Sequence, residues 1–92
     1  MNELETRVFR TGMMLLRAMQ PITMAQLQRE LYSQTVGVHR DNALMWASWF
    51  AIVSQENGLT VVEDDYIDLT IEGWKLKLTD RLGWEVEVAI CD

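Results

Sequence analysis

The sequence predicts an α+β fold in which three helices come first and an antiparallel sheet follows. Three observations carry this prediction: an apolar run at residues 43–53, a helix-capping signature at Thr23–Gln26, and a change of apolar spacing after Gly58. Before Gly58 apolar residues recur at helical spacing, and after it they alternate with polar residues as in half-buried strands. Helices and strands that are segregated along a chain are typical of the α+β class.

The first helix is predicted over residues 3–19, where a broad apolar face stands opposite the arginines at 7, 10 and 17. Gly12 costs such a helix about 1 kcal/mol relative to alanine. It therefore indicates either close packing against a neighbour or a weakened helix. Pro21 ends the helix, because the residue before a proline is displaced from the helical region.

The second helix has a capping box, Thr23-Met-Ala-Gln26, with Ile22 and Leu27 at the spacing of a hydrophobic staple. We expect this helix to run to about Tyr32. A polar connection at residues 33–40 leads to the third helix, and the outline is that of a helix-turn-helix unit.

The third helix is predicted at the apolar run 43–53, in which ten of eleven residues are apolar. Asp41 is the expected N-cap and Asn57-Gly58 the expected C-cap. At roughly 16 Å the run is too short to span a bilayer. A helix that is apolar on all sides is predicted to be buried over most of its circumference. Trp46, near its start, is either a core residue or an anchor for a partner.

Strands are predicted at residues 59–63 and 66–71, joined by a tight turn at Asp64-Asp65. A second hairpin is predicted at residues 74–90, because one register both aligns the apolar residues and pairs Lys75 and Lys77 with glutamates. The resulting meander, or wing, should pack on the third helix.

Length and composition predict one compact domain over residues 1–92. The single cysteine, Cys91, excludes a disulfide within the chain and favours a reducing compartment. No basic segment followed by an apolar run opens the sequence, so we expect no secretory leader and a cytoplasmic location.

Charge is distributed unevenly along the chain. Residues 1–55 hold five arginines against four acids, whereas residues 56–92 hold three basic residues against ten acids. The overall charge of −6 therefore comes from the second part of the chain. Such a surface repels phosphates and attracts basic partners, or it serves solubility alone.

Catalytic and metal-binding patterns are weak. His39 is the only histidine, and a dyad of His39 with Cys91 would place the nucleophile next to the chain end. The acidic cluster around Asp64 lacks the spacing and glycine of a calcium loop, and no phosphate-binding glycine loop is present. We therefore expect no enzyme, no metal and no cofactor.

The layout resembles that of winged helix-turn-helix regulators over about residues 4–74. The resemblance rests on Pro21–Leu31, the helix after it, the Asn57-Gly-Leu59 step and Leu69-Thr-Ile-Glu-Gly-Trp74. It implies that the start of the third helix reads DNA. The residues implied are His39, Arg40 and Asn42, with Arg29 near the DNA backbone.

Two functional hypotheses follow. The first is an acidic protein-interaction module, a regulator or inhibitor that meets a basic surface on another protein. Its contact residues are Glu63, Asp64, Asp65, Asp68 and Glu72, with Trp46 as a possible anchor. The alternative is a winged-helix DNA-binding regulator, dimeric through its first helix, that uses Arg29, His39, Arg40 and Asn42. Neither involves a membrane, and so much apolar surface on 92 residues is compatible with a homodimer.

Overall fold

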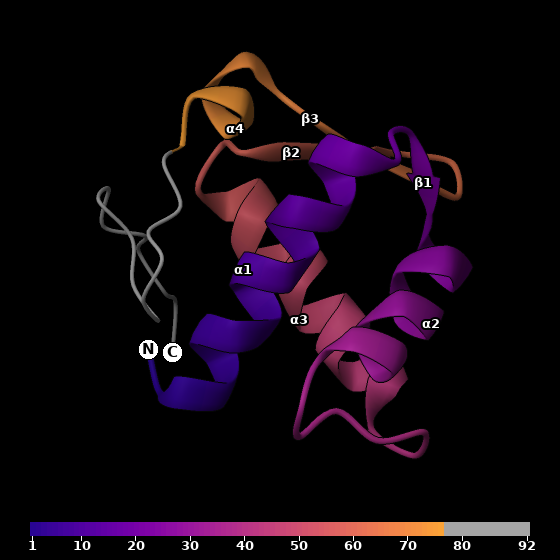
Figure 1. Ribbon diagram of the computed structural model, residues 1–92. Helices are drawn as coiled ribbons and strands as arrows, with labels where there is room; N and C mark the ends of the chain where they lie inside the picture. Colours follow the sequence, from indigo (N-terminus) through magenta and orange to yellow (C-terminus); the bar gives the residue numbers. More distant parts are fainter. Residues whose placement is uncertain (77–92) are drawn as a thin grey trace.

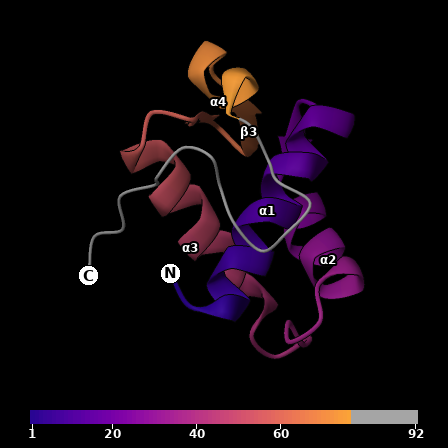
Figure 2. The same ribbon diagram turned by 60° about the vertical axis from the view of Figure 1, so that its left-hand side comes forward.

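The computed structural model describes residues 1–76, in which three long helices pack with a small three-stranded antiparallel sheet. The elements in chain order are α1 (Glu3–Ala18), β1 (Ile22–Thr23), α2 (Met24–Gln34), α3 (Ala43–Glu56), β2 (Thr60–Glu63), β3 (Tyr66–Leu69) and α4 (Ile71–Lys75). The sheet has the order β1-β3-β2 and lies, together with α4, at one end of the helices (Figures 1 and 2). The predicted α+β class, with a helix-turn-helix-like half and a wing, is confirmed.

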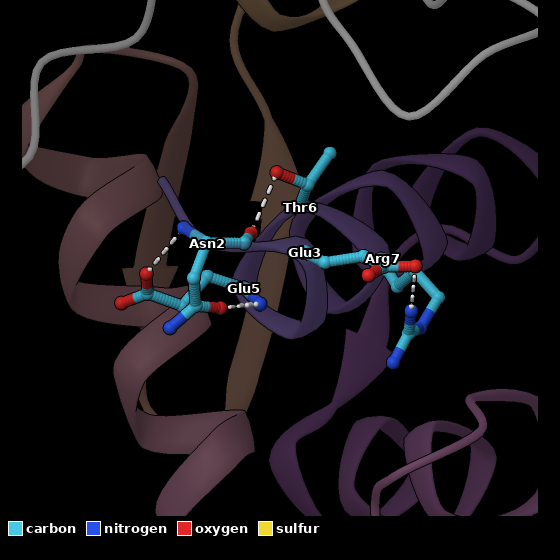
Figure 3. A network of polar contacts seen from close by, with 5 residues as sticks. All are labelled: Asn2, Glu3, Glu5, Thr6 and Arg7. Carbon is cyan, nitrogen blue, oxygen red and sulfur yellow. Dashed lines mark hydrogen bonds and ion pairs between the residues drawn. The ribbon is translucent and has the colours of Figure 1, made fainter.

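Two helices begin with reciprocal capping boxes. In the predicted one, the Thr23 hydroxyl accepts a hydrogen bond from the Gln26 amide at 3.0 Å, and the Gln26 side chain accepts from the Thr23 amide at 2.9 Å. The sequence prediction missed the other, in which Asn2 and Glu5 form the same exchange at the start of α1 (Figure 3). These contacts satisfy backbone donors that the first turn of a helix leaves free.

Helices α1 and α3 pack tightly against each other at Gly12. A Cβ atom at this position would lie 2.4 Å from Cε1 of Phe50, whose ring also packs against Phe9 at a centroid distance of 5.4 Å. All three residues are buried. Of the two interpretations of Gly12 that the sequence left open, close packing is therefore correct.

The sheet contains a strand that the sequence prediction missed. β1 is two residues long and pairs with β3, with Ile22 opposite Ile67. Ile67 and Leu69 are buried on the inner face, as their alternation predicted. Joining the helix-turn-helix half to the hairpin in this way requires a contact between residues more than forty positions apart, which local spacing does not reveal.

Residues 71–75 form a helix, and the prediction of a strand beginning at Trp74 is wrong. The Thr70 hydroxyl caps α4 by accepting from the Gly73 amide at 3.0 Å. The guanidinium group of Arg17 donates to the carbonyls of Gly73 and Leu76, which stabilises the other end. Consequently Ile71 and Trp74, expected on an apolar strand face, are exposed. The rest of the predicted second hairpin lies outside the described residues.

The predicted cap is correct at the C-terminal end of α3 but not at its N-terminal end. Asn57 is the C-cap and Gly58 follows with a φ of 72°, as expected for a helix stop. At the start, Asn42 takes the N-cap position expected for Asp41. The Asn42 side chain accepts from the His39 amide at 2.7 Å, so it closes the preceding turn instead of capping α3.

Replacing Gly12 by alanine should destabilise the protein. Helix propensity favours alanine by about 1 kcal/mol, but the added methyl group would overlap the Phe50 ring. Overpacking a core commonly costs about 1–3 kcal/mol, so we expect Gly12→Ala to lower the free energy of unfolding in urea titration. Combining it with Phe50→Leu should recover part of the Gly12→Ala loss in a double-mutant cycle. A more stable Gly12→Ala variant would contradict the contact.

Candidate functional site

The outward face of α3 is apolar and exposed. Leu44 is 63% exposed, Met45 55% and Ile52 55%, with Ser48 between them on the same side. The helix turns its small side chains and Phe50 toward the core instead. Seven of the eleven residues 43–53 are buried or partly buried, as predicted for most of the circumference, and Leu44, Met45, Ser48 and Ile52 are the exposed exceptions. Helices α1 and α2 and strand β2 contact α3, whereas these four residues stay exposed within the part of the chain that the structure describes.

Trp46 belongs to a group of contacting aromatic side chains. Its ring meets Trp49 edge-to-face at 5.5 Å, and Trp49 meets Phe9 in the same way at 6.3 Å. Both tryptophans are partly buried against the core. The Trp46 indole nitrogen is buried and has no hydrogen-bond partner within the described part of the chain. These contacts favour a structural role for Trp46 over that of a freely presented anchor.

Carboxylates and apolar side chains share the outer face of the β2–β3 hairpin. Glu63 is opposite Tyr66 and Val61 is opposite Asp68 in the strand register, which places all four side chains on one face. We call this region the acidic hairpin surface: Pro21, Val61, Glu63, Asp64, Tyr66 and Asp68, which line a shallow hollow of about 350 Å³. Tyr66 and Val61 are about half exposed, so an apolar centre lies among carboxylates.

The two remaining predicted acids lie elsewhere. Asp65 is exposed in the turn, where its carbonyl oxygen accepts from the Met24 amide at 2.8 Å and ties the hairpin to the start of α2. Glu72 lies on α4, beside Lys75 and Asn57 in a separate hollow. The five predicted acids therefore do not form a single surface.

The residues implied by the DNA-binding alternative come together at the junction of α2 and α3. Arg29 and Arg40 line one shallow hollow, which we call the arginine pocket: Ala25, Gln28, Arg29, Tyr32, Arg40 and Ala43. The guanidinium carbon of Arg40 lies 5.8 Å from the centre of the Tyr32 ring, a cation–π contact. His39 and Asn42 lie in the turn that leads into α3, and His39 is exposed.

Neither Tyr66 nor Tyr32 was among the predicted contact residues. Alternation places Tyr66 on the polar face of its strand, but its pairing with Glu63 depends on the turn length. Tyr32 gives no such signal, because the chain reverses between it and Arg40. Its role in the arginine pocket is a tertiary property.

None of the helices within residues 1–76 is long and apolar enough to cross a membrane. In the same part of the chain, no group of three His, Cys, Asp or Glu side chains is placed to share a metal ion. Comparisons with protein-family models, with curated proteins and with solved structures gave no match for this chain.

Replacing Asp64 by alanine should cost more stability than replacing it by glycine. Its φ of 54° lies in the left-handed region, which costs a residue with a Cβ atom about 1–2 kcal/mol unless, like Asp, it bonds locally. Both substitutions remove the same charge, so the comparison isolates backbone conformation. We expect Asp64→Ala to have a free energy of unfolding about 1 kcal/mol below that of Asp64→Gly in urea titration. Equal stabilities would show that this φ is not required.

Proposed function

We propose that this chain is a non-enzymatic protein-interaction module, a regulator or inhibitor that binds a basic surface on another protein. The observation that carries the proposal is the acidic hairpin surface, on which three carboxylates surround an exposed tyrosine and valine. Aromatic side chains at the centre of an interface, with a polar rim around them, are typical of protein–protein contacts. A cytoplasmic location is part of the same proposal.

Electrostatics supports a basic partner. The hairpin presents Glu63, Asp64 and Asp65 in succession, and residues 1–76 place no Lys or Arg in the acidic hairpin surface. Such a cluster accelerates encounter with a positive surface and repels a negative one, over a range of about 10 Å at 0.1 M salt. Tyr66 and Val61 would then supply apolar contact once the partner has docked.

The same features disfavour nucleic acid as the main ligand. The order helix, short strand, two helices and hairpin supports the resemblance to winged helix-turn-helix regulators. In that class the third helix contacts base edges and the wing approaches phosphates, which requires polar and basic side chains. Here the outward face of α3 carries Leu44, Met45 and Ile52, and the hairpin is acidic. We therefore place the chain's ligand among proteins.

The proposal is tested by charge reversal on the hairpin. Affinity capture from the native cell extract, with and without nuclease, should retain a protein partner after nuclease treatment. Glu63→Lys should then slow association with that partner by roughly threefold to tenfold at low salt, and less at high salt, in surface plasmon resonance.

The matched control is Glu72→Lys, which makes the same change of charge on α4, outside the acidic hairpin surface. It should change the association rate less than Glu63→Lys does. If the two substitutions slow association equally, the hairpin is not the contact surface, and the change of net charge explains the slower association. Capture that disappears with nuclease would contradict a protein partner.

DNA binding is the second candidate, and the arginine pocket favours it. Arg29 and Arg40 converge there, and neither forms an ion pair within residues 1–76. Two adjacent guanidinium groups suit a phosphate, and the His39–Asn42 turn lies beside them.

Under this candidate, Arg40→Ala should abolish retardation of genomic DNA fragments in a gel shift at moderate salt, because it removes one of the two cations. Arg10→Ala on α1, outside the pocket, is the control and should leave retardation unchanged. If the wild-type protein does not retard the DNA, DNA binding is excluded.

A further inference from the structure

The exposed side of α3 carries a ridge of five residues at intervals of four. We call it the α3 ridge: Arg40, Leu44, Ser48, Ile52 and Glu56. Arg40 lies in the turn before the helix, and the other four lie on one side of α3, because residues four apart on a helix are neighbours. All five are exposed. The ridge is independent of the acidic hairpin surface.

The α3 ridge is complementary to itself when reversed. About its midpoint, Ser48, the apolar Leu44 mirrors the apolar Ile52, and the cation of Arg40 mirrors the anion of Glu56. A second ridge laid antiparallel across the first would therefore place each Arg40 near a partner's Glu56 and each Leu44 near a partner's Ile52. A two-fold axis through Ser48 generates all of these contacts at once.

We propose that the α3 ridge is a homodimer interface in which two α3 helices pack antiparallel, with the two-fold axis at Ser48. The small side chain of Ser48 allows two helices to approach to the usual interaxial distance of about 8–10 Å. Leu44, Ile52 and the flanking Met45 supply the apolar surface that association removes from water.

The opposite charges at the two ends of the α3 ridge favour a second copy of this chain over an unrelated protein as the partner. Within residues 1–76, neither Arg40 nor Glu56 forms an ion pair, and their charges are opposite. The guanidinium of Arg40 lies over the Tyr32 ring of α2, and in the dimer it would extend from there toward the exposed side of α3 to reach the partner's Glu56. An apolar partner of another kind would not require opposite charges at symmetrical positions.

Charge reversal gives the first test, by analytical ultracentrifugation of the full chain. Arg40→Glu should weaken the dimer about tenfold, because it brings carboxylates together at both ends of the interface. Glu56→Arg should weaken it similarly by bringing guanidinium groups together. The double variant Arg40→Glu/Glu56→Arg restores opposite charges and should return the dissociation constant to within about threefold of wild type. Failure of the double variant to recover would overturn the antiparallel arrangement.

The apolar part of the ridge is tested by Ile52→Glu, which should weaken the dimer at least about tenfold. Ile71→Glu is the matched control, since Ile71 is also exposed but lies on α4. It should leave the dimer intact. The proposal is overturned if the wild-type chain is monomeric in solution, whatever covers the ridge instead.

Disulfide cross-linking locates the symmetry axis. In a Cys91→Ser background, Ser48→Cys should cross-link the dimer under mild oxidation, since residues on the axis approach within the Cα separation of a disulfide, about 7 Å at most. Leu44→Cys should not, because its copies would lie about 12 Å apart along the helix axes. Cross-linking through Leu44→Cys with none through Ser48→Cys would move the axis and contradict the proposed register.

Discussion

The packing of Phe50 against Gly12 decides which side of α3 faces the core. Because α3 is apolar on nearly every side, hydrophobicity alone gives it no preferred rotation about its axis. The Phe50 ring lies over Gly12 with Phe9 beside it, and this close packing selects one rotation of the helix. The small side chains of α3 then lie beneath the other elements, and Leu44, Met45 and Ile52 face outward. Both the exposed ridge and the arginine pocket at the start of α3 follow from this contact.

A second constraint is the two-residue turn at Asp64-Asp65. It fixes the register of β2 against β3, and a shift by one residue would exchange the inner and outer faces of the strand. The present register buries Ile67 and Leu69 and presents Glu63, Tyr66 and Asp68 together. The bond from the Met24 amide to the Asp65 carbonyl holds this turn against the first residue of α2. The acidic hairpin surface is thus positioned by the helix-turn-helix half of the chain.

The two surfaces have different chemistry and suit different partners. The acidic hairpin surface combines carboxylates with an exposed aromatic ring, which suits a basic protein. The α3 ridge is apolar with one charge of each sign, which suits a copy of itself. They are formed by different residues, so a dimer joined at α3 would leave both hairpins free. Such an assembly would present two acidic surfaces related by symmetry, and a partner with two basic sites would bind it with enhanced avidity.

The sequence by itself determined the elements whose signals are local. The capping box at Thr23, the helix stop at Asn57-Gly58 and the alternation at Ile67 and Leu69 each depend on residues within a few positions of one another. The tertiary structure decided the rest. β1 exists because β3 lies beside it, residues 71–75 are helical because Thr70 and Arg17 bind the ends of that turn, and α3 exposes one side because Phe50 fills the space at Gly12. The physical reason is that an all-apolar helix and a short strand have several local solutions of similar free energy, and contacts between distant residues select among them.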